Sequence, residues 1–210
     1  MTLPIPEGMT AENVVNNYFE AIGGKDKVMA VKTTMTIANA TIQGTPLVMT
    51  IKAAAPNRTS QEISVMGNTM QKAVFNGEKG YQEVQGQKKE MTAEEISEAK
   101  VENALFKDLE YASGELVRIE PLEGENAIVL KYNDTEVYYD ITSGLKVKEV
   151  KTAQTPDGKE MKVPTVFADY KEVNGIKFPH AIGIKSGPMN LDFVVKEIKV
   201  NEGVSDADFE

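Results

Sequence analysis

The chain has 210 residues, a formal net charge of −9, no cysteine, no tryptophan and a single histidine. This length suits one large β-rich domain or two small ones, and it is sufficient to bury a core without disulfides. The absence of cysteine excludes a disulfide framework and a thiolate metal site. The 23 basic residues are scattered among 32 acidic ones and form no cluster larger than one adjacent pair, which argues against nucleic acid and anionic membrane surfaces as partners.

The first nine residues are predicted to be an extended, proline-containing linker. They contain neither the basic region nor the apolar region of a signal peptide, and nowhere does the chain reach 18 consecutive apolar residues, so no membrane-spanning segment is predicted. Residues 10–210 are expected to form a single domain. A cytosolic location is one alternative, but the bare linker favours a periplasmic or otherwise exported protein whose signal, with or without a preceding domain, is absent from this chain.

Two helices are predicted from capping residues and apolar spacing. Thr10 is expected to cap a helix that ends at Gly23, and Thr92 with Glu95 forms a capping box for a second helix over residues 92–112. The apolar residues of the first helix form one stripe: Val14, Val15, Tyr18, Phe19 and Ile22. In the second helix the residues expected to be buried are Ile96, Ala99, Leu105, Phe106 and Leu109.

Most of the remaining chain alternates strands with turn residues, which predicts an α+β fold that is mainly antiparallel β. The predicted strands cover residues 31–42, 47–53, 58–66, 70–75, 80–84, 116–121, 127–132, 136–141, 145–155, 159–170, 176–185 and 191–200. Because 11–12 strands exceed what a flat open sheet tolerates, we expect a strongly curved, half-open β-barrel with helices covering the concave face. The apolar residues of the last strand change face near Lys196, which indicates either a β-bulge or strong coiling there.

The sequence contains few residues that are suited to catalysis. His180 is the only imidazole, so a zinc peptidase helix with two histidines is impossible, and no Gly-x-Ser-x-Gly elbow is present. Paired acids such as Asp206 and Asp208 are typical of solvated surfaces in a chain this acidic. We therefore predict no catalytic residue, no metal site and no cofactor. A hydrolase that uses His180 with a carboxylate is retained as an alternative.

Ten methionines, several in or beside predicted strands, point to an adaptable apolar interior. Two interpretations remain open: the methionines line a cavity for a hydrophobic ligand, or they fill an ordinary core. The predicted cavity lining is Met35, Ile37, Met49, Ile51, Phe178 and Ile182, and the predicted lid is Ile96, Leu105 and Leu109.

Three hairpin sequences resemble a known family. Residues 138–147 (YYDITSGLKV), 169–179 (DYKEVNGIKFP) and 75–81 (FNGEKGY) are similar to hairpins of the outer-membrane lipoprotein carriers, the LolA-like superfamily. Residues 18–24 (YFEAIGG) and 200–209 (VNEGVSDADF) more closely resemble the start and end of a C-terminal extension found on secreted bacterial insulinase-type (pitrilysin-like) zinc peptidases.

The resemblance implies a half-open barrel with a helical lid, an apolar cavity and a periplasmic setting. We therefore predict a non-catalytic cell-envelope module that binds a lipid, an acyl chain or a lipoprotein tail. The alternative is a structural or docking C-terminal domain of a secreted zinc peptidase, with no ligand of its own and an N-terminal peptidase domain as its partner.

Overall fold

The computed structural model describes residues 3–122, 124–154, 158–186 and 189–210. Within these ranges the α-helices are α1 (Ala11–Ile22), α2 (Lys25–Met29) and α3 (Ala93–Glu102), and the 3-10 helices are η1 (Lys107–Ser113) and η2 (Asp206–Phe209). The described strands are β1 (Thr33–Ile42), β2 (Thr45–Ala54), β3 (Arg58–Val65), β4 (Asn68–Phe75), β5 (Gly80–Val84), β6 (Gln87–Glu90), β7 (Glu115–Leu122), β8 (Glu125–Tyr132), β9 (Thr135–Asp140), β10 (Lys146–Gln154), β11 (Glu160–Val173), β12 (Ile176–Ser186) and β13 (Met189–Val200).

The chain divides into two compact units, each made of two segments. The first unit comprises Met1–Val28 and Asp108–Asp192, and the second comprises Met29–Lys107 and Phe193–Glu210. The strands of the first unit are ordered β12-β11-β10-β9-β8-β7, and those of the second β6-β5-β4-β3-β2-β1-β13. Neighbouring strands within each unit pair antiparallel. The predicted fold class, α+β and mainly antiparallel β, is confirmed.

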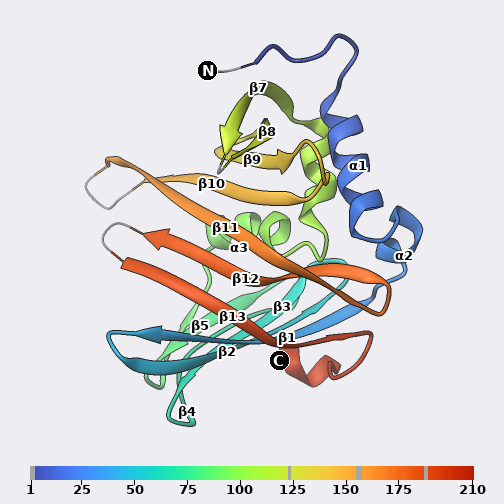
Figure 1. The fold of residues 1–210 in the computed structure, drawn as a ribbon. Coiled ribbons are helices and arrows are strands. Elements are labelled where there is room, and N and C mark those ends of the chain that lie inside the picture. The colour runs from blue at the N-terminus through green and yellow to red at the C-terminus, as the bar shows by residue number, and fades with distance from the viewer. Residues whose placement is uncertain (1–2, 123, 155–157, 187–188) are drawn as a thin grey trace. The chain divides into compact units, whose positions relative to one another are not determined.

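Helix α1 forms where the sequence predicts it and packs on the first unit (Figure 1). The Thr10 hydroxyl accepts a hydrogen bond from the Asn13 backbone N–H, and Gly23 ends the helix with a φ of 142°. A side chain at Gly23 would overlap the carbonyl oxygen of Gly175. Five apolar residues of the predicted stripe are all buried, namely Val14, Val15, Tyr18, Phe19 and Ile22. Burial of this stripe, more than helix propensity, fixes α1 against the sheet.

The second predicted helix is shorter than expected. The capping box of Thr92 and Glu95 is present, but α3 ends at Glu102, and a separate 3-10 helix, η1, follows from Lys107. The Leu105 N–H donates to the carbonyl of Pro56 at 3.1 Å, so the chain after Asn103 bonds to a turn of the second unit instead of continuing the helix. Ala99 is buried as predicted, whereas Ile96, Leu105, Phe106 and Leu109 are half-buried.

Two strand features test the alternation pattern. In the pairing of β1 with β13, Ile37 faces Glu197 and Ala38 faces Val195, so Lys196 is the extra residue of a bulge, one of the two predicted alternatives. Strand β6 was not predicted, because its sequence Gln-Lys-Lys-Glu has no apolar residue to reveal a period of two. The predicted end of the 145–155 strand lies outside the described residues.

The acidic C-terminal segment is part of the second unit's structure. Phe209 joins a buried cluster with Ala54 and Val74. Asp208 pairs with Lys52 at 2.5 Å, and a second ion pair joins Asp206 to Arg58 at 2.6 Å. Asp206 is exposed, as expected for an acid on a solvated surface, but both acids also pair with bases on strands distant in sequence, which the sequence did not reveal.

Candidate functional site

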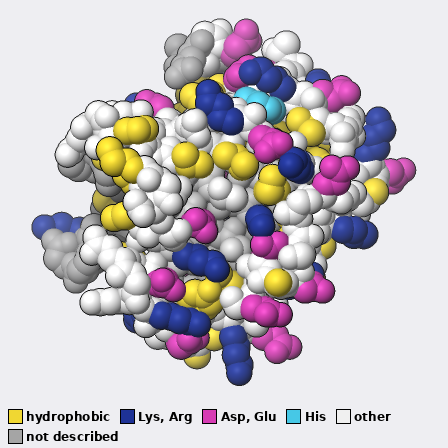
Figure 2. Space-filling model, turned by 90° about the horizontal axis from the view of Figure 1, so that it is seen from below, with side chains coloured by type: hydrophobic (Ala, Val, Ile, Leu, Met, Phe, Trp, Pro, Cys, Tyr) yellow, Lys and Arg dark blue, Asp and Glu magenta, His cyan; other side chains and the backbone are white. Residues whose placement is uncertain are grey.

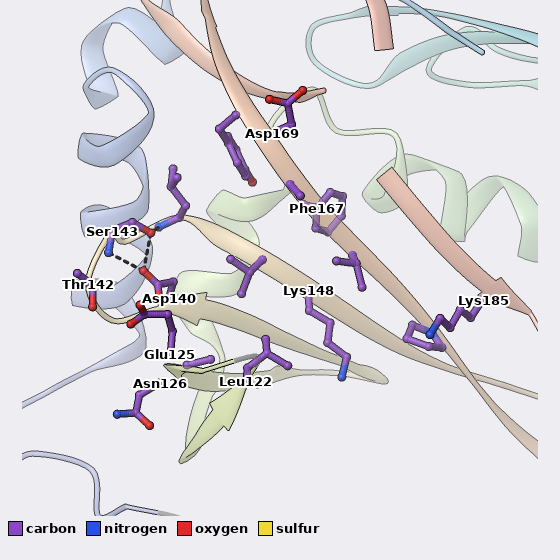
Figure 3. A pocket seen from close by; sticks show the side chains of 17 residues that line it. Leu122, Glu125, Asn126, Asp140, Thr142, Ser143, Lys148, Phe167, Asp169 and Lys185 are labelled. Atoms are coloured by element: carbon purple, nitrogen blue, oxygen red, sulfur yellow. Dashed lines mark hydrogen bonds between the residues drawn. The ribbon is translucent and has the colours of Figure 1, made fainter. Parts of the chain in front are cut away.

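The first unit contains a pocket with a volume of about 780 Å³ (Figure 3). This volume is within the range typical of small-molecule sites, roughly 300–1,000 Å³. Its apolar lining consists of Leu122, Ala127, Leu145, Val147, Pro164, Val166, Phe167, Ala168 and Tyr170. The polar and charged lining residues are Glu125, Asn126, Asp140, Thr142, Ser143, Lys148, Asp169 and Lys185.

Strand register explains why these residues share one face of the first unit's sheet. Directly paired residues of antiparallel strands point to the same side, and Ala127 pairs with Asp140 while Lys148 pairs with Val166. Between Lys146 and Lys148 the register of β10 shifts, so Val147 is an additional residue that also reaches the pocket. The pocket therefore arises from residues far apart in sequence.

Beside the pocket, this face carries a closely packed apolar cluster. It consists of Ala127, Val129, Tyr138 and Val150, with Leu122 and Val147 packed against it. Three of these residues, Ala127, Leu122 and Val147, also line the pocket. The apolar side of the pocket is consequently continuous with buried core, which gives it a rigid support.

The opposite face of this sheet is occupied by α1 and η1. Tyr139, which follows Tyr138 along β9, packs against Tyr18 of α1 with ring centroids 5.5 Å apart. The Tyr111 hydroxyl of η1 donates to Glu149 at 3.1 Å. The pocket thus lies mainly on the side of the sheet that these two helices leave open.

A buried ionic cluster lies under the helices on that opposite face. The Lys146 ammonium donates to Asp108 at 2.9 and 3.0 Å and to Glu149 at 2.9 Å. Only 7% of Lys146 is exposed, and its Nζ lies 4.9 Å from the centre of the Phe167 ring. Burial alone lowers the pKa of Lys146, but the two carboxylates outweigh it and raise the pKa well above its usual range. The Lys146 side chain is therefore charged, and all three of its N–H groups donate to carboxylate oxygens, so its role is structural.

A second charged network borders the apolar cluster on the pocket's face. Arg118 donates two hydrogen bonds to Glu136, at 2.9 and 3.1 Å, and a third to Glu120 at 2.5 Å. Hydrogen bonding from Arg118, with a smaller contribution from the Tyr138 hydroxyl, lowers the pKa of Glu136 to about 2. Burial and the Glu136 carboxylate together raise the pKa of Tyr138 to about 12.

The low pKa of Glu136 predicts a specific pH dependence of stability. An unfolded glutamate titrates near about 4.3, so this contribution is complete above that pH and is lost as the pH falls towards 2. We expect Glu136→Gln to lower the free energy of unfolding by on the order of 1 kcal/mol at pH 7, since the pair is partly solvated, and by clearly less at pH 3. Urea unfolding at both pH values measures this difference. Glu172→Gln, at an exposed glutamate of the same unit, is the control, and a pH-independent effect of Glu136→Gln would contradict the assignment.

The predicted cavity-lining residues do not gather at the pocket, and none of them lines it. In the second unit, Met35 and Ile37 pair with Lys52 and Thr50, whereas Met49 and Ile51 pair with Ala38 and Thr36. Since paired residues share a face, the first two and the last two lie on opposite faces of the β1–β2 hairpin. Phe178 and Ile182 are half-buried on β12 of the first unit. Whether any of these residues lines a ligand cavity stays a prediction, as does the lid of Ile96, Leu105 and Leu109.

His180 is held by the fold in a way that does not require a catalytic role. Its Nδ1 lies 2.9 Å from the carbonyl oxygen of Phe178, and the residue is half-buried. Within the described ranges no three acidic or histidine side chains gather as metal ligands do. On the face shown in Figure 2, lysines, arginines and acids are interspersed instead of forming one basic patch.

No family model matches the chain, and no curated protein matches it by sequence. Several solved structures, however, resemble it in fold. A LolA superfamily protein from Nitrosomonas europaea superimposes with a TM-score of 0.64 at 10% identity, covering 97% of this chain and 98% of that one. The chain has a LolA-like fold.

Two further structures agree with this fold over nearly the full chain. A putative outer membrane lipoprotein-sorting protein domain from Vibrio parahaemolyticus gives a TM-score of 0.62 at 13% identity, covering 95% of this chain and 97% of that one. A DUF1329 family protein from Desulfovibrio piger gives 0.61 at 11% identity, with the same two coverages of 95% and 97%. The resemblance seen in the hairpin sequences is thus confirmed for the fold.

Among the described residues, no helix is both long enough and apolar enough to span a lipid bilayer.

Proposed function

We propose that this LolA-like chain is a non-catalytic cell-envelope module that binds a hydrophobic ligand of the lipid or acyl-chain type. The observation that carries the proposal is the pocket of the first unit, with an apolar floor formed by residues such as Val147 and Val166. A second support is the fold, which it shares with a protein described as a lipoprotein-sorting domain. By the same fold likeness, the proposed location is the periplasm or another exported compartment.

An extended apolar ligand suits this pocket physically. Burial of each methylene is worth about 0.8 kcal/mol, so a chain of around a dozen carbons gains substantial affinity from contact alone. The pocket floor is backed by the buried cluster around Val129 and Tyr138, so it keeps its shape without a ligand. A preformed site loses less affinity to ordering than a mobile one does.

The alternative proposal is a structural or docking domain of a secreted insulinase-type peptidase, with no ligand of its own. The two proposals differ in what accompanies the purified protein. Extraction with organic solvent followed by mass spectrometry is expected to yield a recurrent lipid if the chain is a carrier. An extract without lipid, combined with no binding of the apolar fluorophore N-phenyl-1-naphthylamine, would contradict lipid binding and favour docking.

A variant that fills the pocket tests its role directly. Ala168 lines the pocket and is exposed, so Ala168→Trp adds a large ring in the pocket without disturbing the core. We expect this change to weaken N-phenyl-1-naphthylamine binding by about tenfold, equivalent to about 1.4 kcal/mol. Fluorescence titration measures it, with Ala30→Trp, at an exposed turn residue of the second unit, as the control.

The same assay distinguishes binding at the pocket from binding at the cavity lining that was predicted from the sequence. If the ligand lies instead on the face that bears Met49 and Ile51, Ile51→Trp will reduce fluorophore binding and Ala168→Trp will not. Unchanged binding in Ala168→Trp would therefore overturn the pocket as the site.

A further inference from the structure

The charged residues around the pocket are separated by sign. Figure 3 shows Glu125 and Asp140 together at one end, beside the turn of Thr142 and Ser143, and Lys148 and Lys185 away from them. The pocket is therefore polarised along its length. An elongated ligand with one charged end has a single favourable orientation in such a site.

The two lysines project from the same face of the sheet on either side of β11. Lys148 pairs directly with Val166, and Thr165 pairs with Ile184, so Lys185 lies on the face opposite Ile184, which is the face of Val166. Strands β10 and β12 are both neighbours of β11, so their backbones are about 10 Å apart. Long, flexible lysine side chains reach across this spacing to a group held between them.

The lysines differ from the acids in how their charges are engaged. The Lys148 ammonium lies 4.8 Å from the centre of the Tyr138 ring, and over the described part of the chain neither it nor Lys185 has an ion-pair partner. By contrast, Asp140 accepts hydrogen bonds from the Ser143 N–H and hydroxyl at 2.6 Å, and Asp169 pairs with Lys171 at 2.6 Å. The two ammonium groups therefore leave positive charge available at their end of the pocket, whereas Glu125 and Asp140 keep the other end negative.

Between the two charged ends the lining is apolar. Val166, Ala168 and Tyr170 follow one another along β11, a span of about 13 Å at roughly 3.3 Å per residue. Val147 and Leu145 of the preceding strand and turn line the pocket beside them. A hydrocarbon chain that starts at the lysines thus has an apolar path towards the acidic end.

We propose that the pocket takes a single-chain amphiphile with an anionic headgroup, such as a long-chain carboxylate. The headgroup lies between Lys148 and Lys185, and the chain runs along β11 over Val166 and Ala168. The acids at the far end repel the headgroup and fix the orientation. This inference rests on the proposed function and specifies the chemical class of its ligand.

The test compares three ligands with the same chain and different headgroups: dodecanoate, dodecanol and dodecylammonium. Each is titrated, below its aggregation limit, as a competitor of N-phenyl-1-naphthylamine, and acetate serves as a small carboxylate without a chain. The native protein is expected to bind dodecanoate about tenfold more tightly than dodecanol, and dodecylammonium most weakly, with no effect of acetate. Displacement by acetate at similar concentrations would overturn the proposal in favour of a small-anion site.

Charge reversal identifies the residues responsible. Lys148→Glu with Lys185→Glu is expected to abolish the preference for dodecanoate and to leave dodecanol within about twofold of the native value, since no apolar contact changes. The control is Lys79→Glu with Lys177→Glu, which changes the net charge equally at two exposed lysines outside the pocket. Circular dichroism checks that each variant is folded. If a double variant does not fold, its two single variants are measured instead.

The outcomes separate this inference from the function on which it rests. Equal affinity for the three ligands, or the same loss in the control as in the pocket variant, overturns the anionic headgroup while lipid binding stands. Failure of all three ligands to displace the fluorophore overturns both.

Discussion

Replacement of Lys146 by methionine is expected to lower the free energy of unfolding by about 3–5 kcal/mol. The ammonium is buried against Asp108 and Glu149, and its removal leaves two carboxylates close together without a cation. For a protein of this size the loss corresponds to a fall in melting temperature of on the order of 10 °C. Urea and thermal unfolding measure the effect.

Lys148, two residues along the same strand, provides the control for this prediction. It is half-exposed, so Lys148→Met is expected to cost less than about 1 kcal/mol. Combining Asp108→Asn with Lys146→Met should cost less than the sum of the two single changes, because the pair is removed together. A loss below about 1 kcal/mol in Lys146→Met would contradict the structural role of the cluster.

Phe19→Ala is expected to have an effect of similar size, about 3–5 kcal/mol. Phe19 lies on the buried face of α1 and is fully buried, with its ring centroid 5.5 Å from that of Tyr18. Its truncation leaves a cavity where the helix meets the sheet, and the rigid Tyr18–Tyr139 contact limits how far the site can close. Urea unfolding compares this variant with the native protein.

Glu20→Ala, at the next residue of the same helix, is the matched control. Glu20 is exposed, so its change is expected to alter the free energy of unfolding by less than about 0.5 kcal/mol. Equal losses in the two variants would mean that α1 contributes through its secondary structure and not through its buried face.

Local features of this fold were predictable because each depends on few neighbouring residues. The hydroxyl of Thr10 and that of Thr92 cap their helices, and the change of face at Lys196 marks a bulge. These caps and this bulge depend on three or four neighbouring residues and do not require knowledge of the tertiary packing around them. Strand β6 escaped prediction because its side chains are all polar and exposed.

The pocket was not predictable in the same way, because no short sequence pattern encodes it. Its residues come from several strands and turns of the first unit, and their faces depend on register and on the shift beside Val147. The same register shift places Lys146 on the face opposite Lys148, where it is buried. In a stretch that alternates lysines with valines, every lysine is expected to point to solvent. Its burial depends on Glu149 of the same strand and on Asp108, which lies far away in sequence.

The predicted lining shows the limit of counting apolar residues. Met35 and Met49 were assigned to one cavity on composition, yet their strand partners place them on opposite faces of one hairpin. Alternation within each strand was correct, but register between strands decides which side each set occupies. That register depends on turn geometry and on the packing of both faces, which one sequence does not reveal.

The first unit's pocket is expected to hold an apolar chain, and nuclear magnetic resonance tests this most directly. Dodecanoate titrated into ¹⁵N-labelled protein is expected to shift the backbone amide signals around Val147, Val166 and Ala168. Shifts confined to residues around Met49 and Ile51, or no saturable shifts, would contradict it.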